Sequence, residues 1–168
     1  WEPAYPHVYQ LELSVRVDGT LRDRATVPYA PRSFAWDRDT GFWLNGRNLK
    51  LHGWGTKPTG AWAGLGAAIP DWLRDYTMRQ MADAGGNFLR WGHCAGSGTE
   101  QHYADRYGFV TLMPGVDGER DCDGQAWATR KAAFRDAIIY FRNHPSVMAW
   151  EGGNYNISPA HTAELRQV

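Results

Sequence analysis

The chain has 168 residues, with 18 basic and 18 acidic side chains and a formal net charge of zero. This length accommodates one ordinary domain or parts of two, and 43% apolar with 21% charged residues is typical of a globular protein. The balanced charge indicates no nucleic-acid partner, and no run of about 18 apolar residues predicts a membrane span.

The first predicted element is a strand over residues 8–17, where apolar and polar residues alternate. Alternation with a period of two is typical of a half-buried strand. Asp18-Gly19 indicates a turn, and apolar residues continue at even spacing as far as Tyr29, so we expect a hairpin. Because an isolated hairpin is only marginally stable in water, its apolar face predicts neighbouring strands that this chain does not contain.

A second, tighter hairpin is predicted around Asn45-Gly46. Residues 42–44 lead into this dipeptide and residues 49–51 lead out of it, and both segments are rich in apolar side chains. Asn-Gly is a preferred sequence for a two-residue type I′ turn, since both residues tolerate a positive φ. We therefore expect a tight antiparallel pair at this point.

Strands and helices are predicted to alternate over the rest of the chain. The expected strands cover residues 49–54, 87–91, 109–113 and 147–150, and the expected helices cover 70–84, 100–107, 127–142 and a segment beyond Pro159. Such alternation predicts an α/β fold with a parallel sheet covered by helices. Four units make up about half of a (β/α)₈ TIM barrel, which needs roughly 250 residues. A doubly wound sheet competes, but no Gly-x-Gly-x-x-Gly follows any strand, so a nucleotide-binding version has little support.

Polar, aromatic and glycine residues gather at the expected carboxyl ends of these strands. The segments concerned are residues 52–54, 90–94, 114–119 and 150–156. Functional residues of parallel α/β folds sit at these ends, and this mixture suits a polyhydroxylated ligand. The candidates for substrate contact are Arg90, His93, Asn154 and Trp150. Two alternatives stay open: Arg90 pairs with a core carboxylate, and Trp150 belongs to the hydrophobic core. His144 is expected to shape the start of the fourth strand.

Five segments, in chain order, resemble glycoside hydrolase family 2. Trp1, Pro3, Pro6 and Tyr9 resemble the family's Trp-x-Pro…Pro-x-Leu-Tyr opening, and residues 42–46 with 49–53 resemble its Phe-x-Leu-Asn-Gly…Leu-x-Gly. Residues 84–93 are similar to its Ala-Gly-x-Asn-x-x-Arg-x-x-His segment, and residues 105–109 to its Asp-x-x-Gly-Leu step. Residues 143–154 are similar to its Asn-His-Pro-Ser-Val…Trp-x-x-Gly-Asn block, which is a specific motif.

The resemblance implies a division into domains and an activity. Residues 1–40 would be the C-terminal strands of an immunoglobulin-like β-sandwich, and residues 41–168 the N-terminal half of a TIM-barrel catalytic domain. The implied parent is a retaining, β-galactosidase-like glycosidase, with a carbohydrate substrate and with the remainder of the parent chain as partner. The nucleophile would lie on a seventh strand beyond Val168, so the fragment alone is expected to be inactive.

One position departs from the family pattern. The family's acid/base Glu follows the Gly-Asn pair, where this chain has Tyr155. A phenol is a much weaker acid than a carboxyl group, so we expect the proton donor elsewhere. Glu151 is the first candidate and Glu119 the second. On a straight strand Glu151 would lie about 13 Å below the level of Tyr155, so its assignment needs a bend at Gly152-Gly153.

Two other functions stay open. Tyr155 would also suit a barrel that binds carbohydrate without catalysis, and half a barrel with an open hydrophobic edge would suit a structural or interaction module. No cofactor is expected. Residues 121–123, near Cys94 and His93, lack the spacing of a metal site. Cys94 and Cys122 form no CxxC motif and do not set the compartment, so a periplasmic or extracellular location of the parent stays open.

Overall fold

The structure is a computed structural model that describes residues 1–57, 62–115 and 120–168. Its strands are β1 (Tyr9–Val17), β2 (Thr20–Tyr29), β3 (Phe34–Asp37), β4 (Gly41–Leu44), β5 (Arg47–Asn48), β6 (Gly53–Thr56), β7 (Phe88–Trp91), β8 (Val110–Pro114) and β9 (Val147–Glu151). Its helices are α1 (Asp71–Asp83), α2 (Gly98–Tyr107), α3 (Gly124–Phe141) and α4 (Pro159–Leu165). Within the described ranges the strands form a two-stranded, a three-stranded and a four-stranded sheet.

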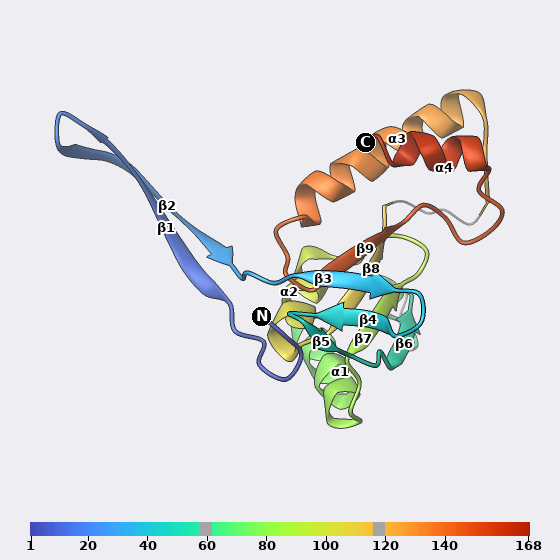
Figure 1. The fold of residues 1–168 in the computed structure, drawn as a ribbon, viewed down its shortest axis with the longest axis horizontal. Helices are drawn as coiled ribbons and strands as arrows, with labels where there is room; N and C mark the ends of the chain where they lie inside the picture. The colour runs from blue at the N-terminus through green and yellow to red at the C-terminus, as the bar shows by residue number, and fades with distance from the viewer. Residues whose placement is uncertain (58–61, 116–119) are drawn as a thin grey trace.

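The N-terminal hairpin of β1 and β2 projects away from the rest of the molecule (Figure 1). The strands pair antiparallel along their length, and Asp18 and Gly19 in the turn have φ of 50° and 77°. The predicted hairpin is therefore confirmed. Every residue of both strands is exposed, so no described residue covers the apolar face of the hairpin. The exposed apolar side chains are Tyr9, Leu11, Leu13, Val15, Val17, Leu21, Val27 and Tyr29.

A short antiparallel sheet of β3, β4 and β5 follows. Asn45 and Gly46 have φ of 50° and 75°, as a type I′ turn requires, so the predicted turn is confirmed. Its second strand was predicted at residues 49–51, whereas β5 covers Arg47–Asn48, directly after the turn. β3 was not predicted, because its four residues are all exposed and it is defined by pairing with β4 rather than by an apolar pattern. The inner side chains of this sheet belong to a buried cluster of Trp1, Ala30, Phe42, Leu44 and Val110. This cluster joins the N-terminal segment to β8.

The four-stranded sheet is parallel, and its strand order β6-β7-β8-β9 follows the sequence (Figure 1). The predicted α/β alternation is therefore confirmed. One side of the sheet is covered by helices, and the main hydrophobic core lies between them. The core residues are Met78, Leu89, Trp91, Ala104, Phe109, Met113, Phe141 and Val147.

The start of the first parallel strand was predicted wrongly. β6 begins at Gly53, whereas the prediction placed a strand over residues 49–54. The reason is the side-chain amide of Asn87, whose Oδ1 accepts from the His52 backbone N–H at 2.9 Å and whose Nδ2 donates to the Lys50 carbonyl at 3.0 Å. The His52 N–H and the Lys50 carbonyl therefore bond to a side chain rather than to a neighbouring strand, whereas the His52 carbonyl accepts from the Asn87 backbone N–H.

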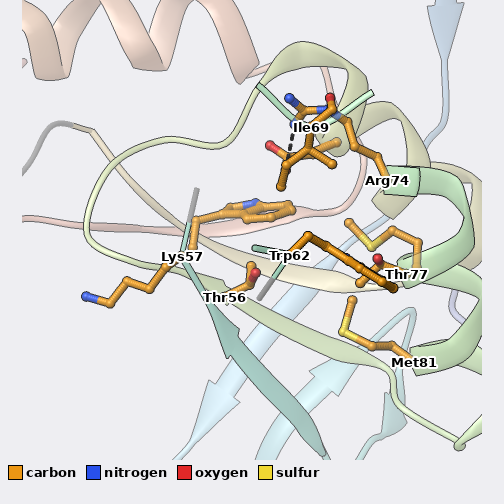
Figure 2. Close-up of a pocket in the computed structure, with 10 residues that line it drawn as sticks. Thr56, Lys57, Trp62, Ile69, Arg74, Thr77 and Met81 are labelled. Carbon is orange, nitrogen blue, oxygen red and sulfur yellow. Dashed lines mark hydrogen bonds and ion pairs between the residues drawn. The ribbon is translucent and has the colours of Figure 1, made fainter. Parts of the chain in front are cut away.

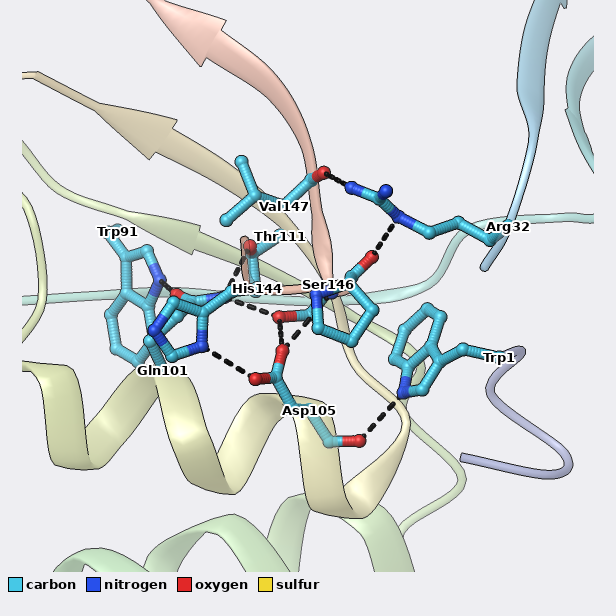
Figure 3. Close-up of polar contacts among 10 residues, drawn as sticks. Trp1, Arg32, Trp91, Gln101, Asp105, Thr111, His144, Ser146 and Val147 are labelled. Atoms are coloured by element: carbon cyan, nitrogen blue, oxygen red, sulfur yellow. Dashed lines mark hydrogen bonds and ion pairs between the residues drawn. The ribbon is translucent and has the colours of Figure 1, made fainter. Parts of the chain in front are cut away.

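A buried polar network lies beneath the sheet and joins α2 to the strands (Figure 3). Gln101, Thr111 and Ser146 are fully buried, and Asp105 is only 6% exposed. Asp105 accepts hydrogen bonds from the Ser146 backbone N–H at 3.2 Å and from the Ser146 hydroxyl, and its other oxygen lies 2.6 Å from Nδ1 of His144. His144 thus shapes the start of β9, as predicted.

Gln101 extends the same network to two further strands (Figure 3). Its amide oxygen accepts from Trp91 Nε1 at 2.9 Å, and its Nε2 donates to Thr111 Oγ1 at 3.0 Å and to the Ser146 hydroxyl. Because each of these polar groups is buried, each would carry a desolvation cost without its partner. The network therefore fixes β7, β8 and the start of β9 against one helix.

We expect Asp105→Ala to lower the free energy of unfolding of the full-length protein by about 3 kcal/mol, because it removes the acceptor of the buried Ser146 donors and of the half-buried His144 imidazole. Urea denaturation followed by tryptophan fluorescence would measure the change. The matched control is Asp136→Ala on α3, whose carboxylate is 76% exposed and 3.8 Å from Arg135. A loss as small as that of the control would contradict the prediction.

Candidate functional site

Three of the predicted site residues come together at the carboxyl ends of β7 and β9. Arg90 Nε donates to Glu151 Oε2 at 2.7 Å, and Arg90 Nη2 contacts Glu151 Oε1, so the pair is bidentate. Arg90 Nη2 also donates to Asn154 Oδ1 at 2.9 Å. The Glu151 side chain is 10% exposed and the Arg90 side chain 33%. This cluster, named the Arg90 cluster, comprises Arg90, Glu151 and Asn154.

The strand register explains why these side chains meet. Leu89 and Trp91 are buried in the helix-covered core, so Arg90 between them points to the other face of the sheet. β8 lies between β7 and β9, with Pro114 in register with Glu151. β9 ends at Glu151, so the chain leaves the strand at Gly152-Gly153, where the sequence predicted a bend.

The Arg90 cluster has a defined hydrogen-bonding polarity. The guanidinium occupies both oxygens of Glu151 and the side-chain oxygen of Asn154. Because the Asn154 oxygen accepts from Arg90, the Asn154 Nδ2 is the atom of this amide that can donate to a ligand oxygen. An ion pair with this bidentate geometry also holds the side chains in one arrangement. The cluster is suited to present a hydrogen-bond donor to a hydroxylated ligand.

Trp150 is placed differently from the other candidates. Its neighbour Glu151 belongs to the Arg90 cluster, and Trp150 lies on the opposite face of the strand. There it packs between two core clusters, and its ring lies edge-on to Phe134 of α3 with centroids 6.3 Å apart. This packing supports the core interpretation of Trp150 over a substrate contact.

The remaining candidates lie at or near the same strand ends. His93 follows β7 by two residues and is half-buried, and Tyr155 is 55% exposed beside Asn154. Glu119 lies outside the described residues, so its role stays a prediction. The expected strand end at residues 52–54 was wrong, because β6 continues to Thr56 and these residues lie before and within the strand.

A separate cavity of about 160 Å³ lies between the ends of β6 and β7, helix α1 and the first turn of α2 (Figure 2). Its lining residues are Thr56, Lys57, Trp62, Ile69, Arg74, Thr77, Met78, Met81, Trp91 and Glu100. Arg74 donates to the Ile69 carbonyl at 2.8 Å and pairs with Glu100 at 2.7 Å, so it ties the segment before α1 to α2. The mostly apolar lining suits side-chain packing better than a sugar, and the Arg90 cluster is the better candidate site.

In the described part of the chain, no group of three or more His, Cys, Asp or Glu is arranged to hold a metal ion. Asp121, considered above for a metal site, instead accepts hydrogen bonds from the Ser158 backbone and from His161. No helix within residues 1–57, 62–115 and 120–168 is long and apolar enough to cross a membrane.

All or nearly all of this chain matches a part of much larger enzymes. No family model matches the chain. It is 53% identical over 168 residues to a β-glucuronidase of Formosa agariphila and spans 17% of that protein. It is 28% identical to a β-galactosidase of Bacteroides ovatus, with 92% of the chain covered and 19% of that protein spanned.

Solved structures agree with these sequence matches. A β-glucuronidase from glycoside hydrolase family 2 superposes with a TM-score of 0.92 at 52% identity, covering 99% of this chain and 18% of that one. A β-glycosidase from Bacteroides vulgatus superposes with a TM-score of 0.83 at 29% identity, covering 98% of this chain and 22% of that one. The chain thus corresponds to about a fifth of the length of its relatives.

A double-mutant cycle can measure the coupling free energy between Arg90 and Glu151. We expect Arg90→Met to destabilise the full-length protein more than Arg90→Met combined with Glu151→Met, because the single change leaves a carboxylate that is 10% exposed without its partner. Since Arg90 is partly solvated, the coupling free energy is expected to be about 1–2 kcal/mol. Urea denaturation of the wild type, both single variants and the double variant measures it, and additive losses would disprove the coupling.

Proposed function

Because the homologues of this chain are β-glucuronidases and β-galactosidases of glycoside hydrolase family 2, we propose that the full-length protein is a retaining glycosidase acting on a β-glucuronide. The observation that carries the proposal is 53% identity to a β-glucuronidase along the whole chain. The β-galactosidase relative shares 28%, so a glucuronide is the better supported substrate and a galactoside the alternative.

The proposal includes a division of the chain. Residues 1–40 would complete a β-sandwich, and residues 41–168 would form the first half of a TIM barrel. The exposed apolar side chains of β1 and β2 support the first part, because they need partner strands to be buried. The parallel order β6-β7-β8-β9 supports the second, because β6 and β9 each leave an edge on which the strands of a closed barrel would pair.

Within that barrel the Arg90 cluster would form part of the sugar site. Asn154 would donate its Nδ2–H to a sugar oxygen, Arg90 would hold Asn154 in that orientation, and His93 would line the same strand end. Retaining hydrolysis needs a nucleophile and an acid/base carboxyl group about 5–5.5 Å apart. The nucleophile would come from a later strand of the full-length protein.

Glu151 is proposed as the acid/base, with Glu119 as the second candidate. Glu151 supports this role by its position at the end of β9 and its burial. Both of its oxygens accept from Arg90, so proton donation requires that substrate binding first separates this pair. If neither carboxylate donates the proton, Tyr155 favours the second candidate function, a barrel that binds carbohydrate without catalysis.

Hydrolysis of nitrophenyl glycosides by the full-length protein tests the function. We expect turnover of the β-glucuronide and at least tenfold lower kcat/KM on the β-galactoside, because a site selects strongly for a group whose charge it must pair. The reverse preference would assign a galactosidase. Glycan binding without turnover would assign the non-catalytic barrel, and neither binding nor turnover would leave a structural or interaction module.

The proton donor is tested by the leaving group. Glu151→Gln in the full-length protein should lower turnover of an alkyl glycoside by about 10²-fold more than turnover of a dinitrophenyl glycoside, because an activated leaving group hardly needs protonation. Glu119→Gln serves as the comparison variant, and circular dichroism checks that both fold. Equal losses on the two substrates would remove Glu151 from the role, and a ratio changed only by Glu119→Gln would assign Glu119.

A further inference from the structure

Asp121 makes a connection between two loops that the sequence did not reveal. It lies between β8 and α3, and its Oδ2 accepts from the backbone N–H of Ser158 at 3.0 Å. Its Oδ1 lies 2.6 Å from Nδ1 of His161. Ser158 is the N-cap of α4, and its Oγ accepts from the His161 backbone N–H at 3.2 Å. We name Asp121, Ser158 and His161 the loop clamp.

The loop clamp contains an ionised carboxylate, and its imidazole packs against a buried indole. The hydrogen bond with His161, assisted by Ser158, lowers the pKa of Asp121 to about 2 against a smaller opposing effect of desolvation, so Asp121 is ionised at neutral pH. The His161 ring stacks on Trp127 of α3, with ring centroids 3.8 Å apart and an interplanar angle of 17°. Trp127 is only 6% exposed, so the imidazole rests on a fixed surface.

The position of the loop clamp relates it to the candidate site. β8 and β9 are neighbouring parallel strands, so their carboxyl ends, at Pro114 and Glu151, lie side by side at the same end of the sheet. The segment after β9, residues 152–158, carries Asn154 and ends at Ser158. The segment after β8 contains Glu119 in the sequence and reaches Asp121. The bond from Ser158 to Asp121 therefore joins the two segments that contain candidate site residues.

We propose that Asp121 and His161 are positioning residues, which hold residues 152–158 in place and thereby set the position of Asn154 at the sugar site. Asn154 is fixed at one side by Arg90, and the loop clamp fixes the other end of its loop four residues later. This inference rests on the proposed glycosidase function for its kinetic consequence. Its structural consequence, a loop ordered by Asp121, does not depend on any activity.

The test compares Asp121→Ala with Lys131→Ala in the full-length protein. Lys131 of α3 donates to Glu164 of α4 at 2.8 Å, so it also ties α4 to α3, and its removal keeps the bond from Trp127 Nε1 to Glu164. Hydrogen–deuterium exchange of a peptide covering residues 152–158 is the first measurement. We expect exchange about tenfold faster in Asp121→Ala, because Ser158 loses a charged acceptor, and unchanged in Lys131→Ala.

Kinetics on the nitrophenyl glycoside that the wild type hydrolyses are the second measurement. A misplaced Asn154 should raise KM about fivefold or more in Asp121→Ala, whereas a mere loss of folded enzyme lowers apparent kcat and leaves KM unchanged. Asp121→Asn keeps an acceptor for the Ser158 N–H, so its KM should lie close to that of the wild type. Lys131→Ala should keep the wild-type KM, because its bond to Glu164 is not part of the loop clamp.

The outcomes separate this proposal from the function itself. Unchanged exchange and KM in Asp121→Ala, or equal changes in Lys131→Ala, would overturn the positioning role. If the wild type hydrolyses no glycoside, the proposed function fails, and the exchange measurement alone still decides whether Asp121 orders the loop.

Discussion

The buried carboxylate of Asp105 is the constraint on which the arrangement of the parallel strands depends. A carboxylate removed from water needs donors, and Asp105 takes them from Ser146 and His144 at the start of β9. The start of β9 is thereby fixed against α2, which also holds Trp91 and Thr111 through Gln101. Because β9 is a continuous strand, fixing its start also sets the position of its other end, where Glu151 contacts Arg90.

The register of β9 shows how this anchor reaches the candidate site. Thr111 is in register with Val147 and Leu112 with Ala149, so one extra residue of β9 lies between these pairs. Beyond that irregularity Glu151 shares a face with Arg90, and Trp150 turns to the helices. A strand without the irregularity would exchange the two faces, because side chains alternate with a period of two.

Much of the fold could be predicted from the sequence, because its signals are local. The turn at Asn45-Gly46 and the alternation from residue 41 onward are visible in short windows. The start of β6 could not be predicted, because the His52 backbone N–H donates to the side-chain amide of Asn87, 35 residues away in the sequence. The candidate site was predicted as a set of residues but not as contacts, since Arg90 pairs with Glu151 over 61 positions and Asp121 with His161 over 40. Periodicity carries no information about such pairs.

The N-terminal segment also reaches across the boundary between the antiparallel and the parallel sheets. Trp1 Nε1 donates to the Asp105 carbonyl at 2.8 Å, and Arg32 donates to the carbonyls of Pro145 and Val147 at 2.8 and 3.2 Å. Burial lowers the pKa of the Arg32 guanidinium, which still donates to this backbone. If residues 1–40 were removed, the parallel sheet would therefore lose the hydrogen bonds that Trp1 makes to Asp105 and that Arg32 makes to Pro145 and Val147. Any segment that replaced residues 1–40 would need an indole and a guanidinium at these two positions to keep the same hydrogen bonds.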